Sequence, residues 1–121
     1  VEAAFSVEEG YQAMKDFIEE ADTRPTAFFA ASDTLAIGAM RALQEAAIRV
    51  PEDISIIGFN DISVAKYVSP TLTTVKVHTE WMGELAVETM KELCLNTPPV
   101  PRKIIVGTEF IQRDSTKHSS K

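Results

Sequence analysis

Two short clusters of polar side chains are the most informative part of the sequence, because each follows an apolar, strand-like segment. Ser32-Asp33-Thr34 follows residues 26–31, and Asn60-Asp61 follows residues 54–58. Their hydroxyl, carboxyl and amide groups can form hydrogen bonds with a small polar ligand. A right-handed strand–helix–strand crossover brings the carboxyl ends of both segments to one edge of a parallel sheet, where ligands bind in open α/β folds. The sequence therefore predicts a small-molecule binding site before it predicts any reaction.

Motifs for catalysis and for metal binding are missing from the sequence. It contains no P-loop and no GxGxxG, HExxH or GxSxG motif. His78 and Glu80 form only a weak metal-binding pair, and no third ligand has suitable spacing. We therefore expect a protein that is not an enzyme and that uses no cofactor and no metal.

Alternating strand and helix patterns indicate the α/β class, with a parallel sheet flanked by helices. The strand-like segments are apolar on both faces, as in parallel strands that lie between layers of helices. The expected strands and helices are too few to cover both faces of a doubly wound sheet, so apolar surface would be exposed on one face. Strands are expected at 26–31, 54–58, 72–77, 103–106 and 109–111, helices from residue 7, from residue 33 and over 80–95, and frayed chain at 115–121.

Individual residues are expected to begin or shape the helices. Ser6 opens a capping box, and Ser32 or Asp33 is expected to cap the second helix. Thr79 is expected to cap the third helix. Gly38 lies inside the second helix, where glycine costs about 1 kcal/mol relative to alanine, and close packing of the helix on the sheet would explain its presence.

Composition limits the classes of protein and of partner. The 121 residues suit one domain, and their formal net charge of −6 counts against direct binding of nucleic acid. No apolar run approaches the length of a membrane span, and no signal peptide is recognisable at Val1. Cys94 is the only cysteine, which fits a reducing compartment. Because the chain begins with valine, we expect either a processed protein or a piece of a longer one.

Four segments together resemble the effector-binding core of LacI/GalR-type transcriptional regulators. They are PTAFFAASDTLAIGAMRALQEA, RVPEDISIIGFND, SPTLTTVKV and FIQRDST, and the resemblance extends from about Val1 to Thr116. It implies a two-lobe fold like that of periplasmic binding proteins, of which this chain holds only part. Residues 1–74 would belong to the C-terminal lobe, and residues 75–121 would cross between lobes, add a helix to the N-terminal lobe and return. The resemblance also implies that the DNA-binding domain lies outside this chain.

The same resemblance implies a function. The parent protein would be a cytoplasmic homodimeric repressor that binds a small-molecule effector, expected to be a sugar, in the cleft between the lobes. It would contact operator DNA only through a missing N-terminal helix-turn-helix. The segment KVHTEWMGE resembles galactose-type repressors. Ala47 stands where many relatives have glycine, and a positive φ there would cost about 1 kcal/mol.

Five residues are candidates for effector contact by this resemblance. Asn60 is the leading candidate, because the family places a carboxylate or amide there that bonds ligand hydroxyls, although a turn residue would also explain it. Ser32 replaces the usual asparagine and favours a water-mediated contact. Asp33 fits a helix cap better than a ligand contact. Phe59 is equally consistent with a pocket wall and with core packing. His78 lies beside the expected crossover, where a structural or solvated role competes with ligand contact.

Two other functions remain open from the sequence. The first alternative is a sugar-binding protein of a transport system, which would share the lobes and lack the DNA-binding domain. The second is a fragment that binds nothing by itself, because half of the cleft wall is missing.

Overall fold

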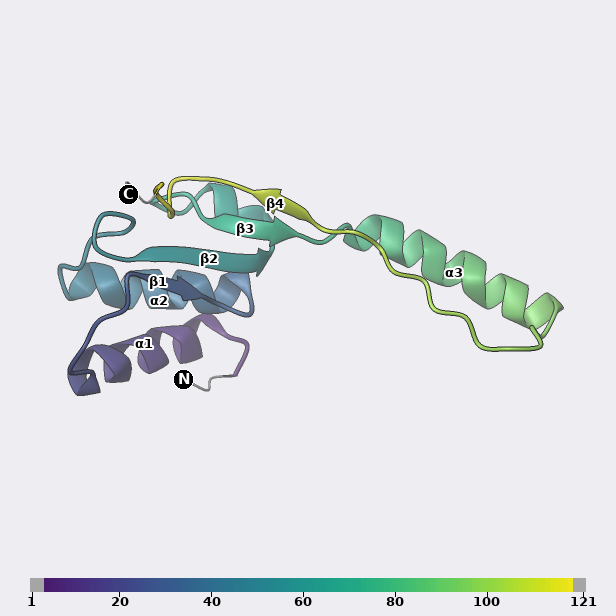
Figure 1. The fold of residues 1–121 in the computed structure, drawn as a ribbon, viewed down its shortest axis with the longest axis horizontal. Helices are drawn as coiled ribbons and strands as arrows, with labels where there is room; N and C mark the ends of the chain where they lie inside the picture. Colours follow the sequence, from purple (N-terminus) through teal and green to yellow (C-terminus); the bar gives the residue numbers. More distant parts are fainter. Residues whose placement is uncertain (1–3, 119–121) are drawn as a thin grey trace.

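The computed structural model describes residues 4–118 and consists of an α/β body and a projecting arm (Figure 1). We define the arm as the third long helix together with residues 96–108, which run back beside it towards the body. The α/β class with a mainly parallel sheet is confirmed. In chain order the elements are α1 (Val7–Glu20), β1 (Ala27–Phe29), α2 (Asp33–Glu45), β2 (Ser55–Asn60), the 3-10 helix η1 (Ser63–Lys66), β3 (Thr73–Lys76), α3 (Thr79–Leu95) and β4 (Glu109–Ile111).

The sheet has the strand order β1-β2-β3-β4. β1 pairs in parallel with β2, and β2 in parallel with β3, whereas β4 is antiparallel to β3. The carboxyl ends of β1, β2 and β3 therefore lie at the same edge, which we call the rim. This arrangement confirms the predicted crossover, and it brings both polar clusters of the sequence to one edge of the sheet.

Helices α1 and α2 cover one face of the sheet and pack closely on each other (Figure 1). A Cβ added to Gly38 would lie 2.6 Å from the Tyr11 backbone nitrogen, and one added to Gly10 would lie 2.8 Å from the Leu35 Cα. The expectation that Gly38 serves helix–sheet packing is therefore wrong, because the close neighbour is helix α1. The buried apolar core of the body consists of Met14, Ala36, Ala39, Met40, Ala42, Leu43, Ile48, Ile54, Ile56, Ala65 and Leu72.

The opposite face of the sheet is uncovered within residues 4–118. Phe29 and Phe110 are 65% and 57% exposed. The register aligns Phe59 with Val75, and Val75 with Phe110, so Phe59 points to this same face. The predicted exposure of an apolar flank is confirmed for the described part of the chain.

The arm extends away from the body (Figure 1), and no residue of α3 is buried. The apolar side chains of the expected helix stripe are exposed, Met90 by 61% and Leu93 by 44%. His78, rather than Thr79, is the N-cap of α3 and makes no side-chain capping bond, so the predicted Thr79 cap is wrong. Residues 103–106 are not a strand, and only Glu109–Ile111 joins the sheet.

The chain following β4 is held firmly against the body, at least as far as Thr116. The Ser115 hydroxyl donates to the Ile56 carbonyl at 2.6 Å and accepts from the Thr73 backbone N–H at 2.8 Å. Ser115 is fully buried, so the prediction of frayed chain from this residue is wrong. Residues 119–121 lie outside the described residues. Ala47 has a φ of 56°, which confirms the positive φ considered for this position.

Candidate functional site: the polar rim of the sheet

A cavity of about 370 Å³ opens at the rim, between the carboxyl ends of β2 and β3 and the beginning of α3. We call it the rim cavity. Its walls combine amide, carboxyl, ammonium and imidazole groups with one indole ring, a combination that can orient a small polar ligand. The residues that line it are Asn60, Asp61, Lys76, Val77, His78, Thr79, Glu80 and Trp81.

Asn60 is exposed and stands at the end of β2, directly opposite Lys76 on β3. Its φ is 112°, and Asp61 follows with a φ of 57°. Positive φ values cost a non-glycine residue about 1–3 kcal/mol, and such strain collects at functional sites. The turn at residues 60–62, which we call the rim turn, therefore combines an outward-facing amide with a strained backbone.

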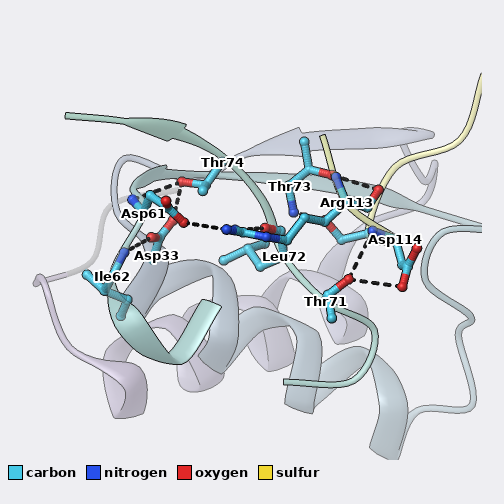
Figure 2. A network of polar contacts seen from close by, with 10 residues as sticks. Asp33, Asp61, Ile62, Thr71, Leu72, Thr73, Thr74, Arg113 and Asp114 are labelled. Carbon is cyan, nitrogen blue, oxygen red and sulfur yellow. Dashed lines mark hydrogen bonds and ion pairs between the residues drawn. The ribbon is translucent and has the colours of Figure 1, made fainter. Parts of the chain in front are cut away.

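A buried network fixes the rim turn from below (Figure 2). The Asp33 carboxyl accepts the Ile62 backbone N–H at 2.8 Å and the Thr74 hydroxyl at 2.6 Å. Thr74 Oγ1 in turn accepts the Asp61 backbone N–H at 3.3 Å. Asp61 also pairs with Arg113, with 2.8 Å between Oδ1 and Nη2. The strained backbone is thus held by side chains from β3, from α2 and from the segment after β4.

Asp33 belongs to this supporting network and does not line the rim cavity. It is fully buried, and it is the first residue of α2 rather than its cap. Of the two candidates for the N-cap, the structure selects Ser32, so the expectation of a capping role for Asp33 is wrong. Contact of Asp33 with an effector stays a prediction, and the observed bonds give the carboxyl a positioning role.

Ser32 follows the end of β1 at the same edge of the sheet as Asn60, but it is only 5% exposed. Its Oγ accepts the Leu35 backbone N–H at 3.3 Å and lies 2.8 Å from Thr34 Oγ1. Capping therefore already uses this hydroxyl. The predicted contact of Ser32 with an effector, direct or through water, stays a prediction.

Phe59 and His78 differ in their relation to the rim cavity. Phe59 packs edge-to-face on Phe29, with 6.4 Å between the ring centroids, on the uncovered face of the sheet. It is not among the residues that line the rim cavity. His78 does line it, and its Nε2 lies 3.8 Å from Glu109 Oε2 on β4. The structure therefore brings His78 beside Asn60 and directs Phe59 elsewhere.

A larger cavity of about 770 Å³ lies between α1 and the free edge of β1. Its lining is mostly apolar and includes Phe5, Met14, Phe17 and Phe28. Such a surface offers few of the hydrogen-bond partners that fix the orientation of a polar ligand. The smaller rim cavity is therefore the better candidate for the effector site.

Comparison with known proteins identifies the family. A family profile described as a periplasmic binding protein-like domain matches residues 1–116. The HTH-type transcriptional regulator GalR of Streptococcus thermophilus is 47% identical over 113 residues, which are 93% of this chain and 34% of that protein. The chain belongs to the LacI/GalR family of repressors. It spans about a third of the length of its GalR relatives.

Solved structures of LacI-family proteins share the fold. The lac repressor dimer bound to operator and the anti-inducer ONPF matches with a TM-score of 0.88 and 30% identity, over 94% of this chain and 39% of that one. A LacI family transcriptional regulator from Enterococcus faecium with bound ribose matches with a TM-score of 0.82 and 31% identity, over 94% of this chain and 41% of that one.

Proposed function

We propose that this chain forms one side of the effector site of a transcriptional repressor, and that Asn60 bonds the hydroxyl groups of a sugar. The observation that carries the proposal is the position of the Asn60 amide, which is exposed at the end of β2 and lines a polar cavity. An amide donates and accepts hydrogen bonds, as each sugar hydroxyl does. Trp81, 53% exposed in the same cavity, adds an aromatic surface for the ring carbons.

The division into two lobes is part of the same proposal. Residues 1–74 would form part of the C-terminal lobe, and residues 75–77 would cross between lobes. The arm would then pack on an N-terminal lobe supplied by another part of the parent protein. The exposed apolar side chains of α3 support this assignment, because they need a covering surface.

Sugar binding would act through the relative arrangement of the lobes. A ligand that binds one arrangement more tightly than the other shifts the equilibrium between them, and the shift can reach a distant DNA-binding domain. We propose that a helix-turn-helix outside this acidic chain contacts operator DNA, in a cytoplasmic homodimer without catalytic activity. The relatives compared above are regulators, which favours this function over that of a transport protein. No helix within residues 4–118 is long and apolar enough to cross a membrane.

A chimeric repressor tests the proposal. The chain would replace the matching third of Streptococcus thermophilus GalR, and calorimetry would measure the binding of galactose, lactose and ribose. We expect galactose to bind, because the sequence of residues 76–84 resembles that of galactose-type repressors. Asn60→Gly removes the amide while leaving the positive φ accessible, and it should weaken binding about tenfold or more, equivalent to about 1.4 kcal/mol.

Asn96→Gly is the matched control, because the chain's other asparagine lies at the far end of α3. It should leave the affinity for galactose unchanged. Binding of none of the three sugars would contradict the proposed effector class. An Asn60→Gly protein with the affinity of the unsubstituted chimera would remove Asn60 from the site.

A further inference from the structure

The segment that returns from the arm contacts the rim at two places. β4 brings Glu109 to His78, with 3.8 Å between Oε2 and Nε2. Two residues after β4, the Arg113 guanidinium reaches Asp61 in the rim turn, at 2.8 Å. Both rim residues line the cavity, so the returning segment is joined to the candidate site although it does not line the cavity itself.

Arg113 is fixed at both ends of its side chain. Its backbone N–H donates to Thr73 Oγ1 at 2.9 Å, and the Thr73 hydroxyl lies 3.1 Å from the Arg113 carbonyl oxygen. The guanidinium extends beside β3, where Nη1 donates to the Leu72 carbonyl at 2.8 Å and Nη2 meets Asp61 (Figure 2). The Arg113 and Asp61 side chains are only 18% and 15% exposed, so water weakens this ion pair much less than a surface pair.

The orientation of Asn60 depends on the backbone of the rim turn, because the side chain itself is exposed. That backbone holds two successive residues at positive φ. Strained backbone persists only where its surroundings over-determine it. The ion pair between the Asp61 side chain and Arg113 is one of the contacts that hold this strained backbone in place.

We propose that Arg113 is a positioning residue for the effector site, which couples the segment returning from the arm to the turn that presents Asn60. This inference rests on the proposed function of Asn60. If the arm belongs to the opposite lobe, β4 and Arg113 are the place where the returning chain is anchored to the body, and a movement of that lobe acts on Asp61 through this anchor. Arg113 would then set the affinity for the sugar without touching it, and binding would in turn bias the position of the returning segment.

The test uses the same chimera with the substitutions Arg113→Gln, Arg113→Lys and Asp61→Asn. Arg113→Gln should weaken galactose binding about 5- to 150-fold, the usual range of coupling between sites. Arg113→Lys should recover part of this loss. Lysine keeps the charge, but it lacks the planar guanidinium that bonds the Leu72 carbonyl and Asp61 at the same time. Arg41→Gln, which removes an exposed ion pair of 2.8 Å on α2, is the control and should bind galactose normally.

A double-mutant cycle separates positioning from general stability. If Arg113 acts through Asp61, the double variant Arg113→Gln/Asp61→Asn should bind galactose no more weakly than the weaker single variant. The backbone 15N shifts of residues 60 and 61 should move in Arg113→Gln and stay in place in Arg41→Gln. Arg113→Lys keeps the charge of the side chain, and it decides the question if Arg113→Gln does not fold, because Arg113 does not line the cavity.

Two negative results have different meanings. An affinity for galactose within about twofold of the unsubstituted chimera in folded Arg113→Gln, with a clear loss in Asn60→Gly, would overturn the role of Arg113 and leave the proposed function intact. An unchanged affinity in both variants would reject the proposed site of Asn60 itself.

Discussion

The substitution Gly58→Ala tests the network beneath the rim turn. Gly58 lies in β2 on the face that meets α2, and a Cβ at this position would overlap the Asp33 Oδ1 atom. The same Cβ would lie 3.0 Å from Leu72 Cδ2 and 3.2 Å from the Asp33 Cα, so the methyl group has no other room. Because Oδ1 accepts the Thr74 hydroxyl at 2.6 Å, turning the carboxyl away breaks that hydrogen bond.

The expected loss of stability follows from two contributions. Overpacking of a tight interior costs about 1–3 kcal/mol. Loss of a hydrogen bond to a carboxylate costs about 1.5–3 kcal/mol. The free energy of unfolding should therefore fall by about 2.5–6 kcal/mol, out of about 5–15 kcal/mol for a typical domain. With a urea dependence of about 2 kcal/mol per molar, the unfolding midpoint should fall by about 2 M.

Urea denaturation followed by circular dichroism measures this shift. Gly83→Ala is the matched control, because a Cβ at Gly83 on α3 has no neighbouring atom within 4 Å. There the same change should raise stability, by at most about 1 kcal/mol. The cost of Gly58→Ala should also shrink in an Asp33→Ala background, because the nearest obstructing atom is then gone and only the looser contacts with Leu72 Cδ2 and the Cα of residue 33 remain. Similar midpoints for Gly58→Ala and Gly83→Ala would refute the argument.

Three further predictions concern other parts of the body. Ala47→Gly should raise the melting temperature through a gain of about 0.5–1 kcal/mol, because it relieves the φ of 56° at a smaller cost in chain entropy; an unchanged or lower melting temperature would contradict this. Hydrogen bonds from Arg49 lower the pKa of Asp53 to about 2. This folded-state pKa lies below the unfolded value of about 3.9, so the ion pair stabilises the fold fully above about pH 3.9 and loses its effect as the pH falls through about 2. An Asp53 titration midpoint of about pH 4, measured by NMR in the unsubstituted chain, would contradict this. Ser115→Ala should cost about 2–4 kcal/mol in urea denaturation, because it leaves the Ile56 carbonyl and the Thr73 N–H buried without their partner, and a loss below about 1 kcal/mol would show that they find another.

Local sequence patterns were sufficient to predict the framework of the site. Apolar segments that end in polar residues correctly indicated β1, β2 and a shared carboxyl edge. The same reasoning predicted that Ser32 and Asn60 follow strands that end at one edge of the sheet, and both residues lie there. His78 was a candidate only through the family resemblance, and it lines the rim cavity together with Asn60. These features depend on short apolar runs that end in polar residues, which can be read from the sequence, and on the right-handedness that is general for such crossovers.

The supporting network was beyond the reach of sequence patterns. Asp33 bonds Thr74 across 41 positions and Ile62 across 29. No periodicity connects such distant partners, so Asp33 resembled an ordinary helix cap. Arg113 lies within FIQRDST, one of the segments that resemble the family, but only the path of the chain returning from the arm shows that it faces Asp61.

Errors at the edges of the fold have a similar origin. Residues 103–106 have the composition of a strand, but β propensity reflects packing against neighbours, and in the structure these residues pair with no strand. Ser115 looked frayed because it begins a polar stretch, whereas its hydroxyl bonds Ile56 and Thr73. In both cases the outcome was decided by contacts with distant parts of the chain.

A crystal structure of the GalR chimera with galactose would test the central claim most directly. The account predicts a sugar ring in the rim cavity, with at least one hydroxyl within about 3.2 Å of the Asn60 amide and with Arg113 still paired to Asp61. A sugar bound elsewhere, while the Asn60 amide remains in contact with solvent, would contradict it.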